Sequence, residues 1–147
     1  MTSETKARTD ADTAIMASIP TSVSGTTTII FNSTLNGGTV ANVSAKYTIM
    51  LNTVVVLRLN GFSCNIGTVA KDYILSQPVP ALIRPYTALT VVVGIRKNAL
   101  TDALGKLTFG NSGEMLLEDF DSTGGYFPAN ATGAGTNMAT VLTYLLA

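Results

Sequence analysis

Catalytic side chains are scarce in this chain, and histidine is missing altogether. The sequence of 147 residues contains no histidine and a single cysteine, Cys64. Without histidine, the chain lacks the commonest general base and metal ligand, and it cannot form a Ser-His-Asp triad. A nucleophilic cysteine also needs a neighbouring base, so Cys64, inside the apolar run GFSCNIG, is predicted to be a buried structural thiol. We therefore expect no catalytic residue and no enzyme activity.

The densest acidic cluster is formed by Glu118, Asp119 and Asp121. These residues lack the regular alternation of oxygen ligands that a calcium loop requires, so a solvated turn is the simpler interpretation. They are also too close together in sequence, and too isolated from other acids, to act as the carboxylate pair of a glycosidase. The glycines of GAGTN at 133–137 lie in a polar loop, without the strand and helix that flank a phosphate-binding loop. We expect no metal site and no cofactor.

The segment from Asp119 to Asn137 is predicted to be a ligand-binding loop. It combines the backbone freedom of several glycines with hydrogen-bonding side chains and one amphipathic ring, a mixture that suits the polar edge and apolar face of a sugar. The predicted binding residues are Asp121, Tyr126, Asn130 and Asn137. The alternative is a long surface connection without a binding role, and Phe127 could equally fill the edge of the core.

The length and composition predict one domain with few charged residues on its surface. Apolar residues make up 46% of the chain and charged residues only 12%, about half of the usual ~25%. Nine basic and nine acidic residues are scattered along the chain, so no basic stripe is available and nucleic acid is not an expected partner. The apolar runs are too short to cross a bilayer as a helix, and the N-terminus lacks the pattern of a secretory signal. We expect no membrane insertion.

Residues 4–19 predict a helix, because they contain no glycine or proline and end before Pro20. The apolar residues form a thin seam at spacings of three and four: Ala7, Ala11, Ala14, Ile15 and Ile19. A thin seam favours packing against identical helices in a coiled coil. A helix this short is marginal alone, so it is predicted to belong to a stem or to be held by the head; the alternative is a frayed terminal tail. The predicted division is a helical stem at 1–20 and a β head at 21–147.

After Pro20 the pattern changes to short β-type runs separated by Gly, Asn and Pro. The predicted strands are TTTIIF, AKYTIML, TVVVLRL, GFSCNIG, LTVVVGI, GKLTF, EMLLE and TVLTYLLA. Many short strands with turn signals between them are typical of a sandwich or barrel. The glycines of GNSG at 110–113 predict a hairpin between KLTF and EMLL. The proline-containing stretch 73–86 is predicted to be an extended crossover, and residues 101–106 a loop.

Three sequence elements together resemble the C-terminal head domains of bacteriophage tail fibres and related viral fibres. The first is KARTDADTAIMASI, which is similar to the alanine- and acid-rich stem segments that precede such heads. The second comprises TVVVLRLNGF, PVPALIRPYTALTVVV and GKLTFGNSGEMLLE, with the Arg84-Pro85 pair in the crossover and the glycine turn at 110–113. The third is the terminal run TVLTYLLA, which contains the pair Thr143-Tyr144.

The resemblance covers most of the chain. It implies an all-β head, an antiparallel β-sandwich of the jelly-roll, C1q- or tumour-necrosis-factor-like type, carried on a short coiled-coil helix in a parallel homotrimer. It also implies attachment to a host-cell surface glycan or protein, at a fibre tip in the virion, by a chain made in the host cytoplasm or nucleus without a signal peptide. The polar insert at 121–137 departs from the phage pattern, so the receptor cannot be carried over. The alternatives are a purely structural trimerisation cap or capsid decoration protein and, third, a glycan hydrolase.

Overall fold

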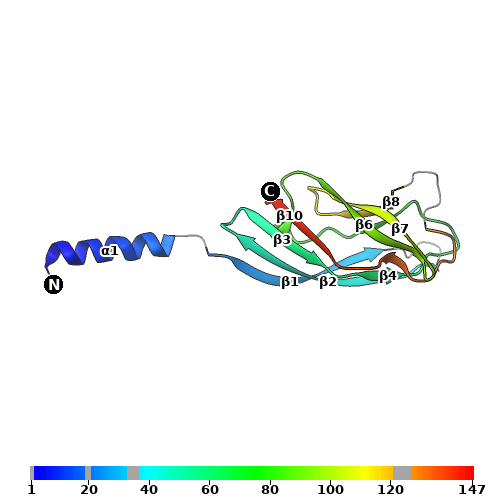
Figure 1. Cartoon of the computed structure of the whole chain (residues 1–147), viewed down its shortest axis with the longest axis horizontal. Coiled ribbons are helices and arrows are strands. Elements are labelled where there is room, and N and C mark those ends of the chain that lie inside the picture. Colours follow the sequence, from blue (N-terminus) through cyan, green and yellow to red (C-terminus); the bar gives the residue numbers. More distant parts are fainter. Residues whose placement is uncertain (1, 19–20, 33–36, 121–126) are drawn as a thin grey trace.

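A computed structural model describes residues 2–18, 21–32, 37–120 and 127–147. It shows a mostly β protein in which one N-terminal helix precedes a ten-stranded antiparallel sheet that curls into a half-barrel (Figure 1). The sheet order is β10-β3-β2-β1-β5-β8-β7-β6-β9-β4. The elements are α1 (Ser3–Ser18), β1 (Val23–Asn32), β2 (Val40–Met50), β3 (Val54–Leu59), β4 (Phe62–Cys64), β5 (Tyr73–Ser76), η2 (Ala81–Ile83), β6 (Leu89–Asn98), β7 (Thr101–Phe109), β8 (Met115–Asp119), β9 (Ala134–Thr136) and β10 (Thr140–Leu145).

The helix α1 buries none of its side chains and lies beyond one end of the sheet (Figure 1). Thr2 caps its first turn, because the Thr5 N–H donates to the Thr2 hydroxyl over 3.3 Å. One turn further on, Lys6 pairs with Asp10 over 2.6 Å on the exposed surface. The predicted helix is thus confirmed over the described residues, and Ile19 lies outside them. Local contacts of this kind are weak, so α1 lacks the packing that stabilises most helices in proteins.

Strict alternation along the strands separates the core from the surface. In β2, for example, Ala41, Val43 and Ala45 are buried while the residues between them are exposed. Because the sheet curls, buried residues from all of its strands form a single apolar cluster. Phe31 of β1 stacks on Phe62 of β4 at a ring separation of 4.1 Å, although their strands are far apart in the sheet order. The curled sheet therefore encloses one core.

Two segments that the sequence assigned to loops or crossovers are strands. Tyr73–Ser76, predicted to be crossover, is β5 and joins β1 to β8 in the middle of the sheet. Its Ser76 hydroxyl accepts a hydrogen bond from the Met115 N–H over 2.8 Å. Residues 101–106, predicted to be a loop, form the first part of β7. Here Gly105 suits a crowded site, since an added Cβ would lie 2.5 Å from the Glu118 carbonyl oxygen and meet the Ile95 side chain.

The turn that the sequence placed at 110–113 is confirmed. The Gly110 N–H donates to the Glu114 carbonyl over 2.8 Å, and Gly113, with φ +97°, closes the hairpin between β7 and β8. The crossover that precedes β6 contains the short 3-10 turn η2 and a bend at residues 86–87, and Arg84 between them is extended. In the described parts of the chain, no helix has both the length and the hydropathy needed to span a bilayer.

Candidate binding surface

The connections at the end of the sheet opposite α1 form a surface that we call the distal tip, comprising residues 65–71, 98–101 and 127–133 (Figure 1). Through Asn65, side chain to backbone hydrogen bonds join two of these connections to each other and to Thr39, which precedes β2. The Asn65 N–H donates to the Thr39 hydroxyl over 2.8 Å, and the Gly133 N–H donates to Asn65 Oδ1 over 3.4 Å. The backbone of the tip is therefore held in place by its own polar groups.

Leu100 is the most exposed large apolar residue among those described, at 96%. It stands in the turn between β6 and β7, where its N–H donates to Asn98 Oδ1 over 2.9 Å. Just inside the turn, Arg96 pairs with Asp102 over 3.1 Å across the two strands. The turn is thus ordered, and an apolar side chain in such a position gains free energy when a partner covers it.

Beside Leu100 lies a shallow hollow of about 320 Å³. Its lining combines apolar with amide and hydroxyl side chains: Asn98, Ala99, Leu100, Pro128, Ala129, Asn130, Ala131 and Thr132. Asn130 adopts a positive φ of 59°, and its N–H donates to the Gly67 carbonyl over 2.8 Å. A mixture of apolar surface with a few fixed polar groups is what small-ligand sites present.

Of the two predicted binding residues that the structure describes, Asn130 borders this hollow and Asn137 does not. Asn137 lines a neighbouring hollow with Phe62 and Arg96, and its half-buried amide packs over Gly94 of β6. Asp121 and Tyr126 lie outside the described residues. The structure therefore does not bring Asn130 and Asn137 into one hollow, and binding by any of the four stays a prediction.

The polar segment that the sequence treated as one loop has structured ends. Asp119 ends β8, is only 4% exposed and forms an ion pair with Lys97. Phe127 is fully buried in the core, which decides between the two roles considered for its ring. Residues 134–136, predicted to be part of a polar loop, form β9 between β6 and β4. The buried Gly135 packs against the Phe62 backbone. The prediction of a loop was wrong because small residues that are required at a crowded strand look like flexible loop residues in the sequence.

The acidic cluster is divided between the two sides of the sheet. Consecutive strand residues point in opposite directions, so Asp119 meets Lys97 on the inside while Glu118 pairs with Lys106 over 3.4 Å on the outside. Across residues 2–18, 21–32, 37–120 and 127–147, no three His, Cys, Asp or Glu side chains gather where they could hold a metal ion. Asp121, the third member of the cluster, lies outside these ranges.

Cys64 is buried, as the sequence predicts, with 3% of its surface exposed. Burial raises the pKa of its thiol to about 11, because the charged thiolate is poorly solvated in the core. At neutral pH the sulfur is therefore protonated and inaccessible, and it is a poor nucleophile.

The sequence reasoning missed two apolar surface features. Leu100 lies in the polar context RKNALTD, where an isolated leucine in a turn was the available signal. The second feature is an apolar outer face on β6, β7 and β8, which consists of Val92 (61% exposed), Leu104 (65%) and Phe120 (61%). The Phe120 N–H donates to the Leu104 carbonyl, which places these two side chains next to each other. The strand register places Val92 diagonally across from Leu104, with Lys106 directly opposite Val92 and Gly94 opposite Leu104.

Comparison with known proteins adds no homologue: no family model matches the chain, and no curated protein matches its sequence significantly.

Proposed function

We propose that this chain is the head of a homotrimeric viral fibre, which attaches the particle to a glycan or protein on the host-cell surface. The proposal rests on the difference between the two ends of the molecule. A helix without buried side chains lies at one end, and the turn between β6 and β7 lies at the other (Figure 1). This turn carries the exposed Leu100, which borders a partly apolar hollow. A fibre head needs this arrangement, with one end for assembly and the opposite end for contact.

The helix supports self-association. Ala7, Ala11, Ala14 and Ile15 of the predicted seam are all exposed, with Ile15 at 61%. Association with identical helices would bury this seam and provide the packing that α1 lacks within its own chain. Parallel association of the stems would also place the heads side by side.

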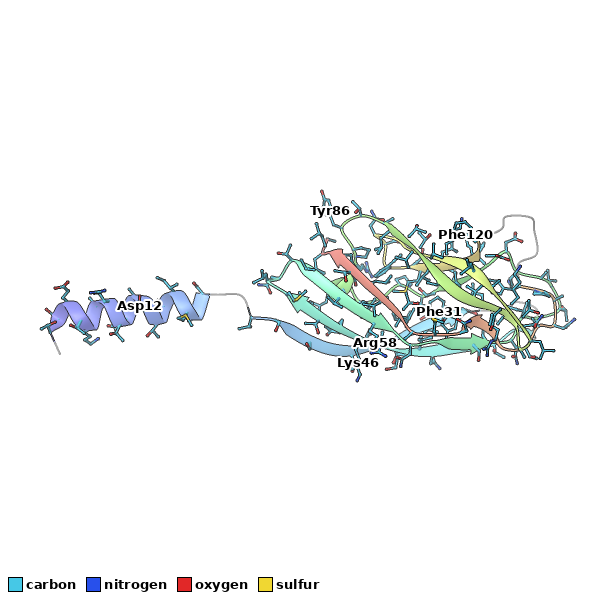
Figure 2. All side chains as sticks on the ribbon, in the orientation of Figure 1. Asp12, Phe31, Lys46, Arg58, Tyr86 and Phe120 are labelled. Atoms are coloured by element: carbon cyan, nitrogen blue, oxygen red, sulfur yellow. The ribbon has the colours of Figure 1, made fainter. Side chains whose placement is uncertain are left out.

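The heads carry apolar surface that such neighbours would cover. Besides the apolar outer face of β6, β7 and β8, a second apolar group lies at the stem end, where Leu145, Val54 and Met50 are cross-strand neighbours. Leu51 and Tyr86 are exposed near them, at 63% and 67%; Tyr86 is labelled in Figure 2. Each interface of a cyclic trimer joins two different surfaces of the subunit, so two separate apolar groups suit this symmetry.

For the head itself we propose the finer description of a jelly-roll sandwich of the C1q- or tumour-necrosis-factor-like type. The single core enclosed by the two halves of the curled sheet supports it. Trimeric display also explains how a shallow hollow serves attachment, because three weak contacts on one surface become avid together.

The test combines solution mass with a binding screen. Light scattering should give about three times the subunit mass of 15.3 kDa. On a panel of surface glycans and cells, Leu100→Ser should weaken binding about tenfold or more, as expected for a central anchor worth over ~1.4 kcal/mol. The matched control is Leu82→Ser, because Leu82 is also exposed, at 56%, but lies in η2 outside the distal tip.

Two outcomes would contradict the proposal. A mass near one subunit would remove the fibre arrangement. A trimer that binds no glycan or cell surface would instead favour a structural cap or a decoration protein, the alternative that the sequence left open.

A further inference from the structure

Two basic side chains stand directly opposite each other on the outer side of the sheet. Lys46 of β2 and Arg58 of β3 are register partners, and both are exposed. Figure 2 shows them close together on the same side of the body. Like charges in this relation repel each other and destabilise a sheet.

The other strand cations have carboxylate partners. Arg96 pairs with Asp102, Lys97 with Asp119 and Lys106 with Glu118. Neither Lys46 nor Arg58 has an ion pair or a side-chain hydrogen bond with any described residue. These two positive charges are therefore uncompensated, in a chain whose formal net charge is zero.

Among the described residues of the four strands around the pair, no outward position is acidic. The residues that alternate outward on β1, β2, β3 and β10 are Ser24, Thr26, Thr28, Ile30, Asn32, Val40, Asn42, Ser44, Lys46, Thr48, Met50, Val54, Val56, Arg58, Val141, Thr143 and Leu145. We call this surface the hydroxyl face. Thr26 is the register partner of Lys46 on one side, and Val141 is the partner of Arg58 on the other. The two cations are thus flanked by a hydroxyl group and by an apolar side chain.

From this arrangement we propose that Lys46 and Arg58 bind the anionic group, a carboxylate or a sulfate, of an acidic saccharide. The guanidinium of Arg58 offers two parallel donors to the oxyanion, and the ammonium of Lys46 adds a second charge. Thr26 and Val141 lie one strand further out on either side of the pair, so the Thr26 hydroxyl and the Val141 side chain are placed to contact the sugar units that flank the anionic one. The bound anion would relieve the repulsion between the two cations.

Two uncompensated cations are too few for a nucleic-acid backbone, which is bound through many phosphate contacts. An exposed pair also binds a single anion weakly, because water and salt screen its charges. The inference therefore rests on the proposed function, in which three copies engage one surface and combine weak contacts.

The experiment uses the full chain and three immobilised probes: dextran sulfate, polygalacturonate and neutral dextran. We expect binding to at least one of the two anionic polymers, none to neutral dextran, and weakening as salt is raised. Lys46→Gln and Arg58→Gln should each reduce this binding at least tenfold. Arg8→Gln is the control, because Arg8 is an exposed cation on α1 and should leave binding unchanged.

A charge reversal separates binding from a structural role. Lys46→Glu would place a carboxylate opposite Arg58, so the melting temperature should stay level or rise by about 1–3 °C while binding to the anionic polymer is lost. If Lys46 had a purely structural role, Lys46→Glu would instead lower the melting temperature.

Three results would overturn the inference: no binding to either anionic polymer, equal binding to neutral dextran, or the same loss with Arg8→Gln as with Lys46→Gln. If neither anionic polymer binds but the chain is a trimer that attaches to cells, the proposed function still stands. A monomer that binds the anionic polymer through Lys46 and Arg58 would refute the fibre proposal and keep the site.

Discussion

The two outer surfaces of the curled sheet have the same kind of backbone but differ in the side chains that they expose. On the hydroxyl face of β1, β2, β3 and β10, hydroxyl side chains lie beside Lys46, and Val56 and Val141 lie beside Arg58. On the apolar outer face, Leu104 and Phe120 stand exposed beside the ion pair of Lys106 and Glu118. Antiparallel pairing determines which residues point outward, and their side chains then determine what each face can contact.

Because their exposed side chains differ, the two faces are expected to contact different kinds of partner. Hydroxyl and amide groups are well hydrated, so the hydroxyl face is stable in water and suited to polar ligands. Large apolar side chains gathered in one place are uncommon on the surface of a soluble monomer and mark contact with another molecule. We therefore expect the apolar outer face and the apolar group at the stem end of the hydroxyl face to be covered in the assembly, while the part of the hydroxyl face around Lys46 and Arg58 stays open.

The largest expected effect comes from placing the same charge on each face. Leu104→Lys should weaken assembly by at least a hundredfold, about 2.7 kcal/mol, because a lysine would have to be desolvated in the interface. Thr28→Lys, at an exposed position of the hydroxyl face, should leave assembly intact. Analytical ultracentrifugation at several concentrations measures both variants. Equal effects of the two substitutions would show that the faces do not differ in this way.

The next effect tests whether the stem or the apolar outer face contributes more to assembly. Deleting residues 1–19 should leave the β-type circular dichroism intact, since α1 buries no side chain. It should cost the trimer about 1–2 kcal/mol, because a marginal helix contributes modestly even when packed, and this should appear as a lower melting temperature. Loss of folding would mean that the stem is part of the core and that the division at residue 20 is wrong.

The smallest effect concerns the core that both faces share. The folded-state pKa of Cys64 is about 11, above the ordinary 9.0, so its contribution to stability is complete below pH 9 and is lost as the pH rises to 11. At pH 10 the loss should be about 1.4 kcal/mol. Burial also raises the pKa of Tyr144 above its ordinary value, so the loss due to this group follows at higher pH.

Urea unfolding of the wild type and of Cys64→Ala between pH 8 and pH 10 measures this contribution. The variant should show a flatter pH dependence, and the monomeric Leu104→Lys should retain the wild-type slope. A slope that disappears in the monomer would place the titrating group in the interface instead of the core.

Local sequence patterns were enough for much of this fold. The proline at position 20 and the absence of glycine before it predicted the helix, and the apolar alternation of runs such as TVVVLRL predicted strands. The glycine turn at 110–113 and the burial of Cys64 were also predicted correctly. Each of these signals depends on neighbours within a few residues, so each can be read without the fold.

The tertiary structure alone decided which residues meet. The strand β5 is only four residues long and precedes a proline-containing crossover, so its place in the sheet depends on β1 and β8, which are distant in sequence. In the sequence, Gly105 resembles a strand breaker. In the structure, the Ile95 side chain and the Glu118 backbone leave no room for a larger residue at this position.

The candidate sites follow the same division. The sequence by itself determined the absence of histidine, the low share of charged residues and the two-part order of helix and strands. The pairing of Lys46 with Arg58 and the gathering of Val92, Leu104 and Phe120 exist only in the folded sheet. The physical reason is register: hydrogen bonds between strands set which side chains become neighbours, and a shift of one residue would turn every one of them to the other face.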